Sequence, residues 1–213
     1  MIKIKQFVFN HFDENTYIIW DESKECAIID PGMNSEAENK KLSGFIADNQ
    51  LVPKKVLLTH AHIDHVAGLR YVCETYGLPV TMHADGQAFL GQAEAYGSAM
   101  GFGTKDMSDL KTEYITDNAT ISFGSSTLKA LYVPGHAAGS MAFVADNPKV
   151  VFTGDVLFRQ SIGRTDLPTG DYDILMKMLN TKVLVLDNDS EVLPGHGPNT
   201  TIGDEKNFNP FLM

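Results

Sequence analysis

The sequence predicts a mixed α/β fold in which two β-sheets are sandwiched between helices. Three observations predict this fold. Strand-like runs alternate with helical segments, antiparallel strand patterns begin both halves of the chain, and four strand-like runs end abruptly at a His or an Asp. A length of 213 residues fits one compact domain, residues 1–213, and is short for two.

The first fifty residues predict three strands and a helix. Residues 2–9, 16–20 and 26–29 are rich in β-branched and aromatic side chains, which favour strands. The Asp-Pro-Gly sequence at 30–32 then predicts a turn. A helix is expected over 35–49, because its first four residues, Ser-Glu-Ala-Glu, match a capping box.

Four later strand-like runs share one pattern, a β-rich stretch that stops at an imidazole or a carboxylate. The runs cover 55–59, 131–135, 150–154 and 191–195, and they end before His60, His136, Asp155 and His196. The interior of a strand packs in the core, whereas the residue after its end lies at the sheet edge, where ligands bind in α/β folds. Glycines at 135, 154 and 195 are expected to allow the sharp turns that this position needs.

Helical segments separate these strands. Residues 66–76 predict a helix that Gly77 ends, and residues 172–179 predict another. The Ala-, Gln- and Gly-rich stretch 84–103 predicts a helix followed by a flexible segment, 97–103, and is expected to be an insertion near the functional site. Its aromatic residues Tyr96 and Phe102 could line a pocket, but packing in the core or on the surface is the favoured interpretation.

The composition argues against nucleic-acid and membrane partners. A net charge of −10 disfavours a phosphate backbone, and no apolar run approaches the ~20 residues of a membrane span. The N-terminus alternates like a strand and does not resemble a signal peptide, so a cytoplasmic location is expected. Cys26 and Cys73 lack CxxC spacing, and each is expected to be a small buried hydrophobic residue.

A cluster of potential metal ligands lies in the stretch His-Ala-His-Ile-Asp-His at 60–65. Residues two apart on a helix do not face each other, so His60 and His62 can converge only on extended or turning backbone. Imidazole and carboxylate without thiolate suit zinc, iron or manganese. Two divalent ions are predicted, one held by His60, His62 and His136, the other by Asp64, His65 and His196, with Asp155 bridging them.

Three other residues of metal-binding type are interpreted differently. His11 and His83 are expected on the surface or in loops. For Asp30 the favoured role is that of a turn residue after a strand, and hydrogen-bonded support of a metal ligand is a further role considered beside it.

These residues resemble the metallo-β-lactamase superfamily, and within it the hydrolases similar to glyoxalase II. The resemblance covers nearly the whole chain and rests on the Asp-Pro-Gly at 30–32, the HxHxDH block, the Pro-Gly-His at 134–136 and at 194–196, and the Gly-Asp at 154–155. It implies an αββα sandwich with metals in a groove at one edge of the sheets, and the same ligand sets. Residues 154–166 and 195–211 are similar to the small bacterial relatives, and the chain lacks the C-terminal helical region with which glyoxalase II helps to hold glutathione.

The function expected from this resemblance is hydrolysis of a thioester such as S-lactoylglutathione by a metal-bound hydroxide. Zinc lowers the pKa of bound water to ~7, and a thiolate leaves without much acid help because thiol pKa is only ~8.5. Asp64 and Asp155 are therefore expected to serve catalysis as metal ligands and not as proton shuttles. Zinc is the metal expected first, with iron and manganese as alternatives.

Arg164 is the candidate for binding a carboxylate of the substrate. It follows the Asp155 loop in a Gly-flanked turn, from which a guanidinium can reach an anionic tail. An ion pair with Asp166 is an equally weighted alternative.

The main alternative function is that of a persulfide dioxygenase with a single iron held by two His and one Asp, because those enzymes share a Gly-Arg-Thr-Asp stretch like 163–166. Nuclease activity is disfavoured by the acidic charge, and a metal-storage or binding module would need a closed site, whereas the loop 154–171 indicates an open one. Hydrolysis of a β-lactam ranks below hydrolysis of a thioester. The sequence does not indicate an oligomeric state.

Overall fold

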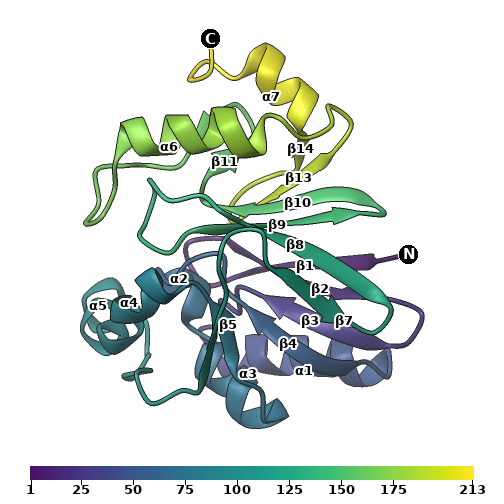
Figure 1. Ribbon diagram of the computed structural model, residues 1–213. Coiled ribbons are helices and arrows are strands. Elements are labelled where there is room, and N and C mark those ends of the chain that lie inside the picture. The colour runs from purple at the N-terminus through teal and green to yellow at the C-terminus, as the bar shows by residue number, and fades with distance from the viewer.

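A computed structural model describes all residues, Met1–Met213, and has four layers in the order helices, sheet, sheet, helices (Figure 1). The first sheet has the strand order β1-β2-β3-β4-β5-β6, and the second has the order β14-β13-β10-β9-β8-β7. This is the αββα sandwich that the sequence predicts.

The first sheet comes from the N-terminal half of the chain. Its strands are β1 (Lys3–Phe9), β2 (Glu14–Trp20), β3 (Glu25–Ile29), β4 (Val52–Leu57), β5 (Val80–Met82) and β6 (Thr112–Tyr114). Pairing is antiparallel from β1 to β3 and parallel from β3 to β6. Its outer face is covered by α1 (Glu36–Asp48) and α3 (Leu69–Tyr76), while the short α2 (Ile63–Val66), a 3-10 turn (Ala84–Gly86), α4 (Gln87–Gly91) and α5 (Ala93–Met100) lie toward one edge (Figure 1).

The second sheet comes from the C-terminal half. Its strands are β7 (Thr120–Phe123), β8 (Ser126–Tyr132), β9 (Met141–Asp146), β10 (Lys149–Gly154), β13 (Glu191–Pro194) and β14 (Thr200–Thr201). The outer face carries α6 (Tyr172–Met178), which continues into a π-helical turn (Leu179–Val183), and α7 (Ile202–Phe208); a small hairpin of β11 (Leu157–Phe158) and β12 (Ser161–Ile162) lies beside them. Antiparallel strands begin both halves, as predicted.

Alternation along the strands divides the apolar residues among three hydrophobic layers. In β2, Tyr17 and Ile19 face the cluster between the two sheets, whereas Ile18 between them faces the helices of the first sheet. In β10, Phe152 belongs to the cluster between the sheets and Val151 to the cluster under α6. Successive side chains of a strand point to opposite faces, so each central strand joins two layers of the sandwich.

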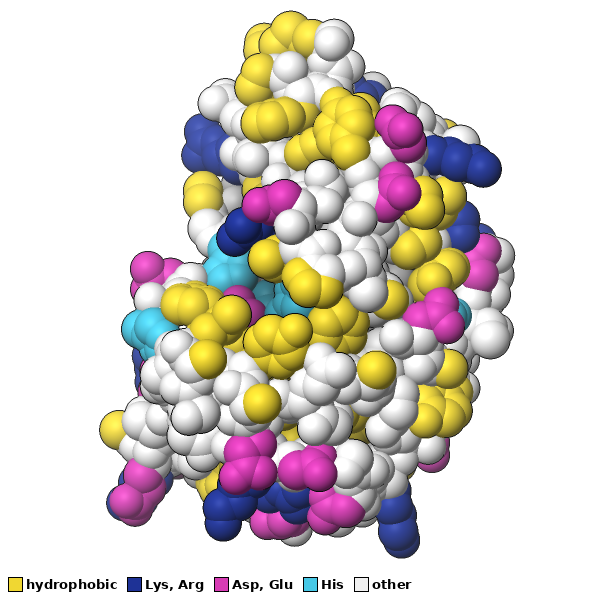
Figure 2. Space-filling view, turned by 90° about the vertical axis from the view of Figure 1, so that its left-hand side faces the viewer, with side chains coloured by type: hydrophobic (Ala, Val, Ile, Leu, Met, Phe, Trp, Pro, Cys, Tyr) yellow, Lys and Arg dark blue, Asp and Glu magenta, His cyan; other side chains and the backbone are white.

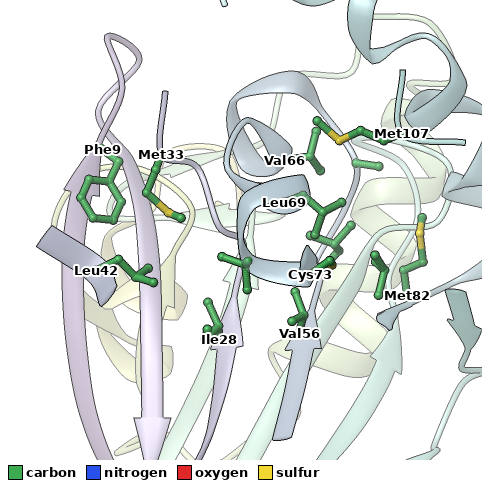
Figure 3. Packing of buried hydrophobic residues seen from close by; sticks show 14 of the residues in the cluster. Phe9, Ile28, Met33, Leu42, Val56, Val66, Leu69, Cys73, Met82 and Met107 are labelled. Atoms are coloured by element: carbon green, nitrogen blue, oxygen red, sulfur yellow. The ribbon is translucent and has the colours of Figure 1, made fainter. Parts of the chain in front are cut away.

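The helices of the first sheet are held by their apolar faces. Leu42 of α1 and Leu69 of α3 point toward Ile28 and Val56 on the strands (Figure 3). Cys73 lies in the same cluster, and both cysteines are free and buried, as predicted. No helix has the length and apolar character that crossing a membrane would require.

The structure corrects two boundaries of predicted helices. The helix expected over 66–76 is divided into α2 and α3, which are separated at Gly68. The flexible segment was expected to begin at Gly97, but α5 continues to Met100, so the predicted start is too early. Gly97 is a position of close approach inside α5, since an added Cβ would collide with the Thr104 side chain. The expected start of α1 is confirmed, with the Ser35 hydroxyl accepting from the amide of Glu38 at 3.2 Å.

Candidate metal centre

The seven predicted ligands meet at one edge of the sandwich. His60 and His62 follow β4, and α2 begins directly after them and carries Asp64 and His65. The C-terminal half supplies the other three ligands from the segments after β8, β10 and β13, namely His136, Asp155 and His196. Histidine side chains lie in a hollow between the two halves of the molecule, with hydrophobic side chains around it (Figure 2).

Two groups of three donors have the spacing of metal sites. Donor atoms of His60, His62 and His136 lie within 4.8 Å of one another, and so do those of Asp64, His65 and His196. These are the two ligand sets that the sequence predicts. The carboxylate of Asp155 lies between them.

The position of Asp155 is defined by three imidazoles. Its Oδ1 is 3.3 Å from Nε2 of His65, and its Oδ2 is 3.7 Å from Nε2 of His136 and 3.6 Å from Nε2 of His196. One carboxylate therefore reaches both ligand sets, which is the arrangement that a bridging ligand needs.

Hydrogen bonds behind the imidazoles orient the ring nitrogens. Nδ1 of His136 lies 2.8 Å from the carbonyl oxygen of Arg164, and Nδ1 of His196 lies 2.9 Å from that of Phe12. A carbonyl can only accept, so each Nδ1 carries the hydrogen and, in the neutral ring, each Nε2 presents a lone pair to the centre.

Asp30 orients two further ligands. Its Oδ2 lies 3.1 Å from Nδ1 of His65 and accepts from the Thr59 hydroxyl at 2.5 Å. The Thr59 oxygen is in turn 3.1 Å from Nδ1 of His60, which can donate to it. Asp30 follows β3 directly with a φ of 50°, so the expected turn role is confirmed, and these contacts show that it also supports the ligands by hydrogen bonds. Asp30, His60 and His65 also form a third close group, but these hydrogen bonds occupy the facing atoms.

The centre contains donor atoms that no protein group satisfies. Nε2 of His60 and Oδ1 of Asp155 are buried and have no hydrogen-bond partner. Nε2 of His65 lies 3.3 Å from Nε2 of His196, and Nε2 of His136 lies 3.0 Å from Nδ1 of His62. Buried polar atoms are normally paired, so the unpartnered atoms and the close approach of these ring nitrogens fit divalent cations bound among them.

The titration of the two ligand sets differs. Burial and the neighbouring imidazoles lower the pKa of His60, and burial with the nearby His136 lowers the pKa of His62 to about 4. Burial also disfavours protonation of His65, but the carboxylates of Asp64 and Asp155 outweigh it and raise its pKa well above the usual value. The pKa of Asp155 is lowered because the surrounding imidazoles outweigh its burial. The centre is thus ionised at its carboxylates.

The glycines before the ligands serve two different purposes. Gly135 and Gly154 have positive φ values of 124° and 50°, as expected for sharp turns. Gly195 does not, so the expectation of a special turn is wrong there. It is needed for space, because an added Cβ would collide with Oδ1 of Asp155 and lie 2.6 Å from Cε1 of His65.

Two buried polar residues at the start of β2 were not predicted. Nδ2 of Asn15 donates to the carbonyl oxygens of Pro194 and Gly197, both at 2.9 Å, and thereby holds the loop that carries His196. Glu14 is fully buried, burial raises its pKa well above the usual value, and Oε1 is 3.9 Å from Nδ1 of His65. The only sequence signal was a run of polar residues inside an otherwise apolar strand.

A cavity of about 330 Å³ opens beside the centre, and His62, Asp64, His136 and Asp155 form part of its wall. Tyr96 lines this cavity, so the favoured packing role is wrong for Tyr96. Phe102 is buried against the rings of His11 and Phe12, so the packing role is correct there.

Arg164 also lines the cavity, and its guanidinium forms two hydrogen bonds of 2.8 Å with Asp166. The ion pair with Asp166 is therefore present, and the position of Arg164 is also compatible with binding a carboxylate of a substrate. His11 is exposed in the loop after β1, and His83 stacks on Tyr132 at 4.1 Å, so neither histidine belongs to the centre, as predicted.

Comparisons with known proteins agree with this architecture. Residues 10–196 match the family model described as the metallo-β-lactamase superfamily. The chain is 36% identical over 203 residues to the hydroxyacylglutathione hydrolase GloC of Haemophilus influenzae. The alignment covers 94% of this chain and 93% of that protein.

Two solved structures superpose closely. The BLEG-1 B3 metallo-β-lactamase has a TM-score of 0.89 at 35% identity and covers 99% of this chain and 100% of its own. TTHA1623, solved in a di-iron-bound form, has a TM-score of 0.87 at 34% identity and covers 98% of this chain and 100% of its own. With its four layers and the His and Asp cluster at their edge, the chain belongs to the metallo-β-lactamase superfamily.

Proposed function

We propose that the protein is a two-metal hydrolase that cleaves thioesters of small molecules. The observation that carries this proposal is the position of Asp155 between two complete triads, beside a cavity large enough for a substrate. The hydroxyacylglutathione hydrolase named among the relatives supports a thioester as the substrate.

In this proposal the chain holds both ions and positions the substrate. His60, His62 and His136 would hold one ion, Asp64, His65 and His196 would hold the second, and Asp155 would serve both. Two divalent ions bound there would supply Lewis acidity toward a carbonyl oxygen and a water-derived nucleophile near neutral pH. Zinc is the proposed metal, and iron is the alternative that the di-iron form of TTHA1623 supports.

The leaving group explains the choice of a thioester. The carboxylates of the centre, Asp64 and Asp155, both have lowered pKa values, so neither is available as a general acid at neutral pH. An alkoxide or an amine needs a proton in order to leave, whereas a thiolate needs little help because thiol pKa is ~8.5.

Arg164 is proposed to bind an anionic part of the substrate, since its exposed ion pair with Asp166 contributes little to stability and can open. We place this activity in the cytoplasm and in one domain, residues 1–213.

The test combines metal analysis with turnover of the same sample. Purified protein is assayed for metal content and for hydrolysis of S-lactoylglutathione and of simple acyl thioesters. The control is Asp189→Ala, because this exposed carboxylate pairs with Lys149 at the opposite end of β10 from Asp155. Wild type and Asp189→Ala are expected to hold two ions and to hydrolyse thioesters. Asp155→Ala is expected to lose both properties.

Other results would indicate a different function. A single iron with oxygen uptake on glutathione persulfide and no thioester cleavage would indicate the dioxygenase. Hydrolysis of a chromogenic β-lactam without thioester cleavage would indicate a β-lactamase.

A further inference from the structure

The wall of the cavity beside the metal centre is strongly apolar. The α4–α5 segment contributes Phe89, Ala93, Tyr96 and Met100, and Phe12 and Leu167 line other parts of the wall. In Figure 2, hydrophobic side chains border the lower side of the hollow that contains the histidines, and a basic and an acidic side chain lie above it. The charged or titratable side chains that line the cavity are Arg164, the Tyr96 phenol, and the His and Asp residues of the centre.

A second, more open hollow lies on the other side of His136 and Asp155. It has a volume of about 470 Å³, and its wall combines Arg159, Ser161 and His196 with the apolar residues Phe158, Ile162 and Pro198. The two hollows share His136, Asp155 and Arg164, so the metal centre lies between an apolar cavity and a more open hollow that also offers the Arg159 guanidinium. A substrate whose scissile bond lies at the centre therefore has one end in each.

We propose that the acyl group of the substrate is uncharged and apolar and occupies the cavity formed by the α4–α5 segment, while the thiol carrier lies in the more open hollow. This inference rests on the proposed thioesterase function and deepens it. A glutathionyl group carries two carboxylates and one ammonium group, and the apolar cavity offers them the single guanidinium of Arg164. Burial of unpaired charge is unfavourable, so the charged part of any substrate belongs outside this cavity.

The size of the cavity limits the acyl group. A space of ~150 Å³ holds a benzene molecule in a protein core, so about 330 Å³ accepts a phenylacetyl or a hexanoyl group. Each methylene group that enters is expected to improve binding about fourfold.

The inference is tested on the metal-loaded protein with two series of compounds. The first is a series of inert thioethers of N-acetylcysteamine with methyl, butyl and hexyl groups, whose dissociation constants are measured by calorimetry. The second is the series of acetyl, butanoyl and hexanoyl thioesters of the same carrier, whose kcat/KM values are measured. Both are expected to improve about 16-fold between the four-carbon and the six-carbon members.

Variants of the cavity wall locate the effect. Met100 is 42% exposed at the end of α5, so Met100→Glu can be accommodated, and it is expected to abolish the dependence on chain length. Tyr96→Glu serves the same purpose if that protein does not fold. Val185→Glu, a matched change of an exposed hydrophobic residue outside the cavity, is expected to keep the dependence.

The outcomes separate the two proposals. Thioester cleavage without dependence on chain length, or a hexyl thioether that binds no better than the methyl one, overturns the inference and leaves the proposed function in place. Binding that improves with chain length without any thioester cleavage supports an apolar ligand and overturns the proposed function.

Discussion

Oδ2 of the Asp30 carboxylate lies 3.1 Å from Nδ1 of His65, and both side chains are almost completely buried. This contact fixes the ring so that Nε2 faces the metal centre. Partners of this kind, one step removed from the metal, typically contribute 10–100-fold to metal affinity. Asp30→Ala is therefore expected to weaken the ion at Asp64, His65 and His196 by about that factor, as measured by competition with a chelator. An unchanged affinity in folded protein would contradict the supporting role of Asp30.

Asp155 is expected to affect both ions, because its carboxylate lies near imidazoles of both ligand sets: Oδ1 near His65, and Oδ2 near His136 and His196. Asp155→Ala should lower metal content at both positions and reduce turnover by more than the Asp30 variant does. Metal stoichiometry and the metal-dependent shift in Tm measure this effect. Loss of one ion with full retention of the other would show that the carboxylate does not bridge.

The pH dependence of metal binding is expected to differ between the two sets. An imidazole must be neutral to bind a metal. The pKa values of His60, His62 and His136 are lowered, so these rings remain neutral as pH falls, whereas those of His65 and His196 are raised, so these rings take up protons first. The ion at Asp64, His65 and His196 should thus dissociate at higher pH than the other. Metal content after equilibration between pH 8 and pH 5 tests the order, and simultaneous loss of both ions would contradict it.

Asn15 is expected to stabilise both the fold and the second ligand set. Asn15→Ala leaves the carbonyl oxygens of Pro194 and Gly197 without this donor, and an unsatisfied buried group costs about 1–3 kcal/mol. Denaturant unfolding should show this loss, together with weaker binding of the ion that His196 holds. Gln6→Ala is a suitable control, because Gln6 touches the same network only through Oδ1 of Asn15. Equal effects of the two changes would argue against a specific hold on the loop.

Asp21 connects the two sheets at the end far from the metal centre. Its carboxylate accepts from the Ser23 amide at 2.9 Å and from the Ser125 amide at 2.7 Å, and such bonds, against the effect of burial, lower its pKa to about 2. A lowered folded-state pKa stabilises the protein above the unfolded value of ~4, and this stabilisation is lost as pH falls through 2. Asp21→Asn should therefore reduce the free energy of unfolding by about 1–2 kcal/mol at pH 7 and by much less near pH 2. A difference that does not change with pH would contradict this assignment.

The sequence predicts those parts of the centre that depend on local pattern. The spacing within 60–65 excludes a common helical face, and the strands before His136, Asp155 and His196 end at the same sheet edge, so the grouping of these side chains could be predicted. The fold follows from the alternation of apolar residues. The ends of helices were less predictable, since α5 continues through Gly97, where the close approach of Thr104 leaves no room for a side chain.

The supporting residues could not be predicted in the same way, because they act across long separations in the chain. Asp30 and His65 are 35 positions apart, and Asn15 and Pro194 are 179 positions apart. Nothing in either local sequence specifies the partner, so the contact exists only once the sheets have packed together. A polar residue in a buried strand indicates that a partner is needed, and only the tertiary structure identifies it.

Each proposed triad draws members from both halves of the chain: His60 and His62 with His136, and Asp64 and His65 with His196. Neither half therefore contains a full set of donors, and a fragment that ends before β7 would hold an incomplete coordination sphere. On the proposed ligand sets, tight metal capture becomes possible only after the second sheet has docked on the first. The ions would then stabilise the folded protein after its two sheets have packed, and they would play no part in nucleating folding.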